Sequence, residues 1–196
     1  DSAALRSSVV SHAKTLGYEP TSCRAPVATV NISLETDSPT KTMIAGTAFT
    51  TIVDGTSFQF VTIADITASN IGNTVSFDST SIYEGTYVTI KYIVNTSDVE
   101  QRFVLTDDRA DTSTLTVQVQ NAVNDSNLTT YTKATDITQL SAASSVYYLQ
   151  EVENGRFEVY FGDGVVSKAL SDGNVVILKY VVTNKTASNG ASSFSA

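Results

Sequence analysis

The sequence predicts a mainly-β protein, in which an N-terminal helix is followed by two antiparallel, sandwich-like β units and the terminal part forms a β-meander. Three observations support this class. Ser, Thr and Val dominate while Leu, Glu and Lys are scarce, and that mixture favours strands over helices. From residue 27 onward, apolar residues recur with a period of two. In the last quarter, turn pairs that contain glycine recur at regular intervals.

The helix is predicted over residues 2 to 16, where apolar residues recur at spacings of four, four and three. Gly17 follows at a position suited to a left-handed cap, and Pro20 prevents the helix from resuming. We interpret His12 as a packed or half-exposed helix residue, because nothing near it in the sequence would orient it as a base. The apolar face consists of Leu5, Val9, Ala13 and Leu16.

After the helix, alternation of apolar and polar residues predicts strands with one buried face and one face that tolerates water. In the first of these strands, Val30 and Ile32 point one way while Asn31 points the other. A short helix is also predicted within residues 137 to 143. Alternation is strong at residues 27–34, 88–94 and 114–120, and weaker strands are expected at 43–49, 57–63, 75–78 and 102–105.

The meander is predicted from three dipeptides, Asn154-Gly155, Asp163-Gly164 and Asp172-Gly173, which tolerate the positive φ angles of tight hairpins. The last predicted strand is apolar on both faces except at Lys179, so we expect it to be central or covered on both sides. The strands around these turns are expected at about 146–152, 156–161, 165–170 and 174–183.

This pattern divides the chain into three parts. The N-terminal helix and its connection take residues 1–20, a first β unit takes 21–100, and a second β unit, ending in the meander, takes 101–196. A gapless similarity between residues 82–95 and 170–183 supports two β units of comparable size. Because the chain begins without Met and ends straight after a long strand, we expect it to be a piece of a longer polypeptide.

Composition argues against several classes of function. A net charge of −8 with no basic cluster repels phosphate backbones, so no nucleic-acid partner is expected. No apolar run approaches the roughly 20 residues that a membrane-spanning helix needs, so no membrane partner is expected. Cys23 and His12 are the only residues of their types, which leaves no Cys/His metal site and no disulfide within the chain. No cofactor or metal is therefore predicted.

The carboxylates are the remaining candidates for chemistry. Asp163 and Asp172 form a candidate glycosidase pair, but each directly precedes a glycine at a predicted turn, where Asp is favoured for bonding its own backbone. The group Asp107, Asp108 and Asp111 lacks the alternation, the glycine and the distal Glu of a calcium loop, so we interpret it as an exposed acidic linker. No phosphate-cradling glycine motif occurs. The sequence therefore predicts a protein that is not an enzyme.

The stretch "FEVYFGDGVVSKALSDGNVVILKYVVTNKTASNG" resembles the baseplate J-like family, the wedge components of contractile phage tails and related injection machines. The similarity extends to "LGYEPTSCRAPVATVNISL", "IAGTAFT", "IYEGTYV" and "QRFVLTDDRADTSTLTVQV", and it is greatest to the N-terminal half of the large wedge proteins of T-even-type phages. The chain departs from many relatives at Ser167, which replaces a second glycine. The matching turn motif is Phe161, Gly162, Asp163, Gly164, Asp172, Gly173, Asn189 and Gly190, together with Tyr180.

The resemblance implies a structural role. Proteins of this family dimerise and link neighbouring wedges into a ring around the tail hub, so the implied partners are a second copy of the protein and other baseplate wedge proteins, with no small-molecule substrate. The implied location is the tail baseplate of the virion, after assembly in the host cytoplasm. In this interpretation the Phe-Gly-Asp-Gly motif is a rigid turn that fixes the register of a hairpin.

Two other functions remain open from the sequence. An extracellular adhesin or receptor-binding β module would share the Ser/Thr-rich strands. A tail-associated glycan hydrolase would need Asp163 and Asp172 to converge on one cleft.

Overall fold

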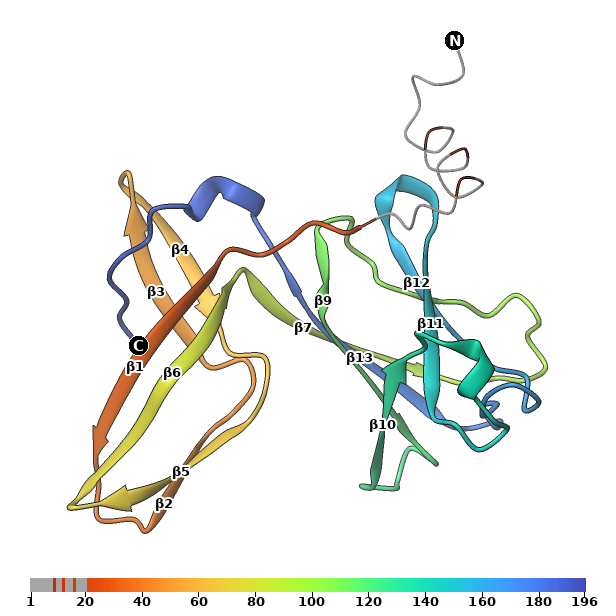
Figure 1. Ribbon diagram of the computed structural model, residues 1–196, viewed down its shortest axis with the longest axis horizontal. Helices are drawn as coiled ribbons and strands as arrows, with labels where there is room; N and C mark the ends of the chain where they lie inside the picture. Colours follow the sequence, from red (N-terminus) through yellow and green to blue (C-terminus); the bar gives the residue numbers. More distant parts are fainter. Residues whose placement is uncertain (1–8, 10–11, 13–15, 17–20) are drawn as a thin grey trace. The chain divides into compact units, whose positions relative to one another are not determined.

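The computed structural model describes residues 9, 12, 16 and 21–196 (Figure 1). It divides into two compact units, each discontinuous in sequence. Unit 1 comprises Asp1–Cys23 and Thr89–Tyr180, and unit 2 comprises Arg24–Val88 and Val181–Ala196. Among the described residues, no helix has the length and apolar character needed to cross a bilayer.

Unit 2 is built on a six-stranded antiparallel sheet. The long strand β6 organises it, because β1 pairs along β6 from Val27 opposite Tyr83 to Glu35 opposite Thr74. The strand order is β2-β5-β6-β4-β3, with β1 also bonded to β6. The strands are β1 (Val27–Glu35), β2 (Thr40–Met43), β3 (Ala48–Val53), β4 (Thr56–Val61), β5 (Ile66–Ile71) and β6 (Thr74–Glu84).

The core of unit 2 lies on one face of this sheet, where alternate residues of each strand point inward. The C-terminal residues, which follow the 3-10 helix η4 (Lys185–Ser188), return to this core and place Phe194 edge-on to Phe60 at 5.0 Å between ring centroids. The buried cluster consists of Met43, Phe49, Phe60, Val75, Phe77 and Ile82.

Unit 1 is built on a seven-stranded sheet with the order β7-β13-β9-β10-β11-β12-β8. The pairs β9–β10, β11–β12 and β12–β8 are antiparallel, whereas β10 and β11 run parallel, with Thr132 opposite Val146. The strands are β7 (Thr86–Ile93), β8 (Phe103–Val104), β9 (Ala110–Gln120), β10 (Leu128–Lys133), β11 (Val146–Glu151), β12 (Phe157–Phe161) and β13 (Val175–Val182), and the 3-10 helices are η2 (Ile137–Gln139) and η3 (Glu153–Gly155).

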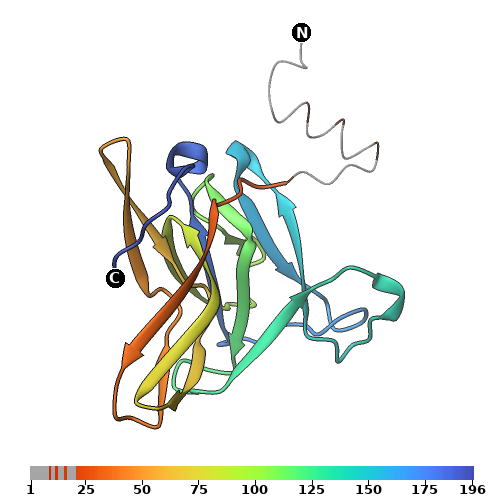
Figure 2. The ribbon, with the colours of Figure 1, turned by 60° about the vertical axis from the view of Figure 1, so that its left-hand side comes forward.

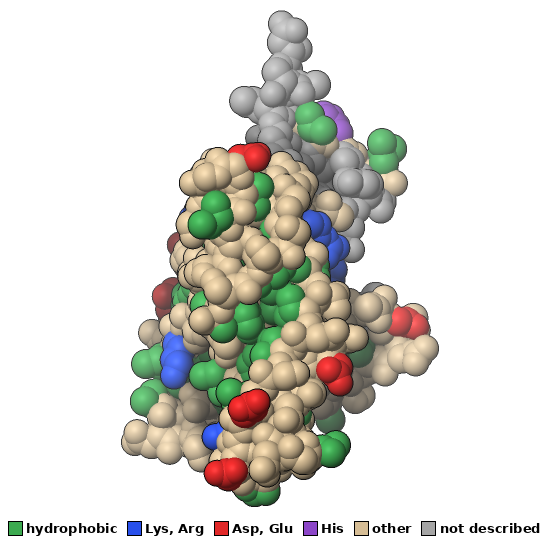
Figure 3. All heavy atoms as spheres, turned by 90° about the vertical axis from the view of Figure 1, so that its left-hand side faces the viewer, with side chains coloured by type: hydrophobic (Ala, Val, Ile, Leu, Met, Phe, Trp, Pro, Cys, Tyr) green, Lys and Arg blue, Asp and Glu red, His purple; other side chains and the backbone are tan. Residues whose placement is uncertain are grey.

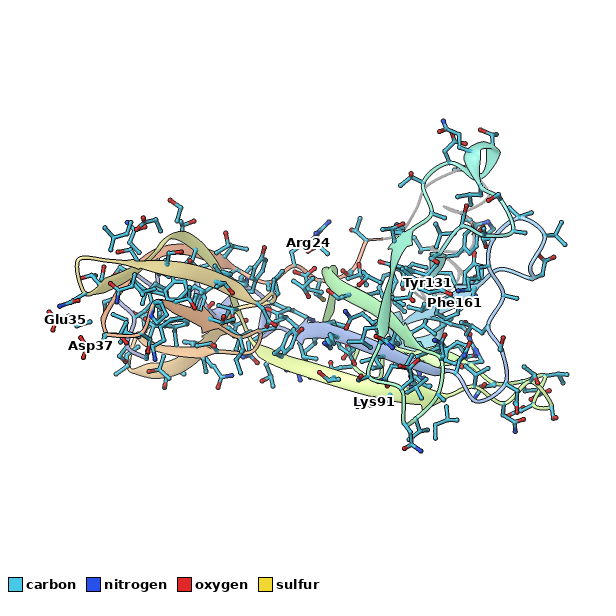
Figure 4. The ribbon with its side chains drawn as sticks, turned by 90° about the horizontal axis from the view of Figure 1, so that it is seen from below. Arg24, Glu35, Asp37, Lys91, Tyr131 and Phe161 are labelled. Atoms are coloured by element: carbon cyan, nitrogen blue, oxygen red, sulfur yellow. The ribbon has the colours of Figure 1, made fainter. Side chains whose placement is uncertain are left out.

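Side chains bring the two ends of the seven-stranded order together, so the sheet curls towards a barrel. Tyr92 on β7 donates its hydroxyl to the Val104 carbonyl at 2.6 Å, and its ring lies 5.6 Å from that of Phe103 on β8. The contacts continue from Phe103 to Phe161 at 5.6 Å and from Phe161 to Tyr131 at 5.4 Å, all edge-to-face. Figure 4 shows Tyr131 and Phe161 against each other. A chain of aromatic contacts therefore links β7, β8, β12 and β10 in unit 1.

The structure confirms that the chain is mainly β, and the strongly alternating segments are strands β1, β7 and β9. The segment expected to be central, β13, lies between β7 and β9 and is buried along nearly its whole length. The short helix expected within residues 137 to 143 is the 3-10 helix η2.

Two expectations differ from what the structure supports, and a third is not tested. The predicted helix at 2–16 lies outside the described residues except at three positions, so it is not supported, and two residues of its expected packed face, Val9 and Leu16, are exposed. Each unit holds one sheet, so a sandwich of two packed sheets within a unit is not supported. The predicted domain boundaries at residues 20 and 100 stay a prediction beside the discontinuous units found here.

The terminal β-meander is also wrong. Residues 162–174 form a loop in place of the predicted strand at 165–170, and β13 pairs with β7 and β9 but not with β12. Val165 and Val166, at the start of the predicted strand, are exposed at 74% and 44%. The close approach of Gly162 to Ser167 folds the loop back on itself, so the chain cannot run alongside β12 there.

Candidate functional site

The Phe-Gly-Asp-Gly motif forms a loop whose polar groups are bonded locally. Phe161 ends β12 with its ring in the aromatic interior of unit 1. Asp163 accepts a hydrogen bond from the Val165 backbone N–H at 2.9 Å, and this bond lowers the pKa of the Asp163 carboxyl. Gly164 has a φ of +88° and donates its N–H to the Ser167 carbonyl at 2.9 Å. The motif is therefore a closed turn, although it does not connect two paired strands.

Gly162 is the position in this loop at which a side chain cannot fit. A Cβ atom there would lie 1.9 Å from Ser167 Oγ and 2.6 Å from the Ser167 carbonyl oxygen. Ser167 is itself completely buried, and its hydroxyl lies 3.4 Å from that of Tyr148. Tyr148 in turn stacks on Tyr160 with ring centroids 5.1 Å apart. The residue that departs from the family pattern, Ser167, is thus the residue against which Gly162 packs.

The second turn of the motif joins two strands of unit 1. Asp172 accepts hydrogen bonds from the backbone N–H of Thr96 at 3.0 Å and from its hydroxyl at 3.4 Å. Gly173, with a φ of +76°, donates its N–H to the Val94 carbonyl at 2.9 Å, and the Asn174 carbonyl accepts the N–H of Val94 at 2.8 Å. The Asp-Gly pair therefore holds the end of β7 against the start of β13.

The third pair lies in unit 2. Asn189 follows η4 and donates its backbone N–H to the Thr186 carbonyl at 3.2 Å, and Gly190 has a φ of +100°. The predicted turn residues thus occupy three separate turns, two in unit 1 and one in unit 2. Their shared structural role stays a prediction.

The carboxylates do not assemble into a reactive group among the described residues. Asp163 and Asp172 are bonded to different segments, Val165 and Thr96. Asp107 pairs with Arg109 at 3.2 Å; burial acts to raise the pKa of Asp107, but the hydrogen bonds from Arg109 outweigh it and the pKa lies below its usual value. Within the described part of the chain, no group of three or more His, Cys, Asp or Glu side chains is placed to hold a metal ion.

Sequence reasoning missed Glu84, at the end of β6, which is the most deeply buried carboxylate in the described part of the chain. Glu84 is completely buried and accepts three hydrogen bonds: from the Thr183 hydroxyl at 2.7 Å, the Asn184 backbone N–H at 2.9 Å and the Asn184 side-chain amide at 2.7 Å. These neutral donors satisfy both oxygens, as a buried charge requires. Glu84 therefore fixes the chain where it leaves β13.

Gly85 follows Glu84 and packs against the same segment. Its φ is +126°, and a Cβ atom there would lie 2.2 Å from the Val182 carbonyl oxygen and 2.9 Å from a methyl carbon of Val181. Only glycine fits such a backbone and such a distance. The signal available in the sequence was the Glu-Gly pair inside the quoted segment "IYEGTYV".

Among the buried carboxylates of unit 1, Glu158 on β12 faces a cation. The Arg102 guanidinium donates to both oxygens of Glu158, through Nε at 2.9 Å and through a terminal nitrogen at 2.7 Å. Gln150 donates to the same carboxylate at 3.2 Å. The hydrogen bonds from Arg102 lower the pKa of Glu158. This ion pair ties the segment before β8 to the β11–β12 hairpin.

Comparison with known proteins gives the family. A model of the third domain of the bacteriophage baseplate wedge protein gp6 matches residues 89–191, more than half of the chain. The baseplate wedge protein gp6 of Enterobacteria phage T4 is 27% identical over an alignment that covers 97% of this chain. The chain spans 31% of the length of that relative. The resemblance read from the sequence is therefore confirmed, and the chain belongs to the family of baseplate wedge protein gp6 third domains.

Proposed function

We propose that this chain is a structural component of a phage tail baseplate wedge, that it is not an enzyme, and that it resides in the tail baseplate of the virion after assembly in the host cytoplasm. The observation that carries this proposal is the family match over residues 89–191. This range contains most of unit 1 and the two turns that hold Asp163 and Asp172. The proposed partners are a second copy of the protein and other wedge proteins, which together form the ring around the hub.

The geometry of the turns supports a structural role. Asp163 and Asp172 accept hydrogen bonds from backbone N–H groups, and Gly162, Gly164 and Gly173 shape the backbone around them. Such groups fix loops in place and leave little capacity to bind or react. A baseplate part that must hold its form within a large assembly requires this kind of rigidity.

The proposal is tested by assembly. The protein that carries this chain is produced alone and together with the other wedge proteins of the same phage, and the masses of the complexes are measured under native conditions. We expect oligomers of the protein alone and its incorporation into larger complexes with its partners. A protein that remains monomeric in both mixtures would contradict the assembly role.

The absence of enzymatic activity is tested separately. Replacing both Asp163 and Asp172 with Asn preserves the size of the side chains but removes their charge. We expect the variant to assemble as the unchanged protein does, and we expect neither protein to release sugars from host cell-wall glycan. Release of sugars that is lost in the double variant would favour a hydrolase.

A further inference from the structure

The C-terminal arm, which we define as residues Thr186–Ala196, closes the open side of the unit 2 sheet. Thr50 on β3 donates its N–H to the Ser195 carbonyl at 2.7 Å and accepts the N–H of Ser195 at 2.9 Å. Phe194 inserts against Phe60, and Ala191 packs on the same core cluster. Figure 1 and Figure 2 both place the end of the chain beside β3 and β1. The arm thus makes a single antiparallel bridge to the edge of β3.

The arm leaves hollow space on both of its sides. A hollow of about 430 Å³ lies between β1 and the arm, and apolar side chains such as Val30, Ile32 and Phe49 contribute to its wall. A second hollow of about 370 Å³ lies along the outer part of β3, beside Ile52 and Ser57. Phe194 borders both. Figure 3 shows this face, with apolar side chains visible between polar ones. The two hollows together form a groove, which is open to solvent on both sides of the Phe194 ring.

The arm is joined to a fixed anchor through a strained residue. Glu84 holds Thr183 and Asn184, which keeps the chain in place up to the arm. The next residue, Lys185, has a φ of +63°, a left-handed backbone that is unfavourable for any residue with a Cβ atom. Lys185 is therefore a short, strained hinge, and its strain is relieved when the backbone extends. Strained hinges of this kind favour the exchange of identical segments between two copies of a protein.

From these observations we propose that two copies of this chain exchange their C-terminal arms, so that the arm of each copy occupies the groove beside β3 on unit 2 of the other. The proposal rests on the self-association in the proposed function and assigns it a surface. The groove identifies its occupant, because it already binds Phe194 and Ser195 of the same chain. Exchange preserves each of these contacts, so it requires no new complementary surface, and straightening at Lys185 releases the backbone strain twice per dimer.

The test traps the arm in its groove with a disulfide. Thr50 and Ser195 form a hydrogen-bonded antiparallel pair, for which the Cα separation of about 5.5 Å suits a disulfide. Both are replaced with Cys in a background in which Cys23 is replaced with Ser, and two copies with different affinity tags are produced in the same cells. After oxidation, the chains are separated by electrophoresis under denaturing, non-reducing conditions.

Exchange predicts covalent dimers that carry both tags. A matched control pair, Thr42→Cys with Thr67→Cys, joins β2 and β5 within one chain and should give only monomers, because those strands lie side by side inside unit 2. The substitution Lys185→Gly removes the strain and should lower the dimerisation constant about 30-fold, since two hinges each lose a penalty of the usual size. Dimers that are as abundant in the Lys185→Gly variant as in the protein that retains Lys185 would contradict the role of the hinge.

The outcomes separate this inference from the proposed function. Oligomers in solution whose Thr50→Cys and Ser195→Cys disulfides lie within single chains would overturn the exchange and leave self-association intact. Free thiols at both positions would also overturn it, because the arm would then not occupy the groove of either copy. A protein that stays monomeric even with its wedge partners would defeat the proposed function itself.

Discussion

Unit 1 and unit 2 close their sheets by different means. In unit 1, rings carried by strands β7, β8, β10 and β12 meet in the interior, so each contact is held by a hydrogen-bonded strand. In unit 2, the open side is closed by Phe194 on the C-terminal arm, which makes a single bridge to β3. An aromatic contact in unit 1 can therefore be lost only when the sheet itself opens. The contact of Phe194 in unit 2 can be lost while the sheet stays folded.

Two buried carboxylates, Glu158 in unit 1 and Glu84 in unit 2, are held in opposite ways. Glu158 in unit 1 is neutralised by Arg102, whose side chain is 53% exposed, so this ion pair lies at the surface. Glu84 in unit 2 is completely buried and is satisfied by neutral donors from Thr183 and Asn184. An interior carboxylate of this kind depends on every one of its donors, whereas a surface ion pair can exchange its partner for water. Unit 2 therefore combines a rigid anchor with a loosely held arm.

The largest effect is expected where the anchor is rigid. Replacing Gly85 with Ala forces a Cβ atom towards the Val182 carbonyl and requires a backbone that only glycine adopts, so the free energy of unfolding should fall by about 4 kcal/mol or more. Denaturant titration measures this change. The control is Gly55→Ala, where φ is +79° but no atom lies within 4 Å of the new Cβ, and the loss should be only about 1 to 2 kcal/mol. Equal losses would show that the contact with Val182 contributes nothing.

The contrast between the aromatic contacts gives the next effect. Replacing Phe161 with Ala removes a ring in contact with both Phe103 and Tyr131, and should cost about 3 kcal/mol of global stability. Replacing Phe194 with Ala should cost only about 1 kcal/mol globally, because the arm opens locally before the sheet unfolds. Hydrogen exchange measured by mass spectrometry should show faster exchange confined to β3 in the Phe194 variant. Faster exchange throughout unit 2 would mean that the arm is part of the cooperative core.

Glu84 tests whether the anchor depends on its hydrogen bonds. Replacement with Ala removes three hydrogen bonds and leaves the buried Thr183 hydroxyl without its carboxylate acceptor, which should cost about 2 to 3 kcal/mol. Replacement with Gln should cost about 1 kcal/mol, because the Asn184 amide can turn to present its oxygen to the new amide group. Thermal unfolding of the two variants measures the difference. If the Gln variant proves no more stable than the Ala variant, shape rather than hydrogen bonding holds the anchor.

The smallest effect is expected at the surface ion pair, and it depends on pH. Because the pKa of Glu158 is lowered in the folded protein, its interaction with Arg102 stabilises the fold above the ordinary glutamate value of 4.5 and is lost as the pH falls through the lower, folded value. Stability measured between about pH 6 and pH 3 should therefore decrease less steeply in an Arg102→Gln variant than in the unchanged protein. Parallel curves would show that the pair makes no contribution to folding.

The sequence predicted those strands in which apolar and polar residues alternate because one face packs on the core and the other faces solvent. Strands β1, β7 and β9 alternate clearly, whereas β2, β5 and β10 were missed because Thr, Ser, Asn and Lys occupy both of their faces. Gly155, Gly164 and Gly173 have positive φ angles, but an Asp-Gly pair shows only that the chain bends and not which strand it will meet next. The insertion of β13 between β7 and β9 is a long-range pairing that local patterns do not encode.

Local sequence patterns do not encode long-range contacts, and this also explains which residues of the turns and of the Glu84 anchor could be predicted. Asp163 and Asp172 were predicted to serve the backbone, and in the structure both accept backbone N–H groups. Glu84 was missed because its donors lie 99 and 100 residues further along the chain, and Thr and Asn at such a distance carry no signal of a partner. Ser167 was noted only as a departure from the family, and the structure shows that it packs against Gly162.

The discontinuity of the two units sets an order of completion during translation. Once Tyr180 has left the ribosome, every segment of unit 1 is available, whereas unit 2 still lacks Val181–Ala196. The nascent chain therefore carries β1 to β6 with Phe60 uncapped and Glu84 without its donors until Val181–Ala196 emerge. Most of unit 2 emerges before most of unit 1, yet unit 2 is the later one to finish folding. A polypeptide truncated before Val181 should therefore aggregate through β1 to β6.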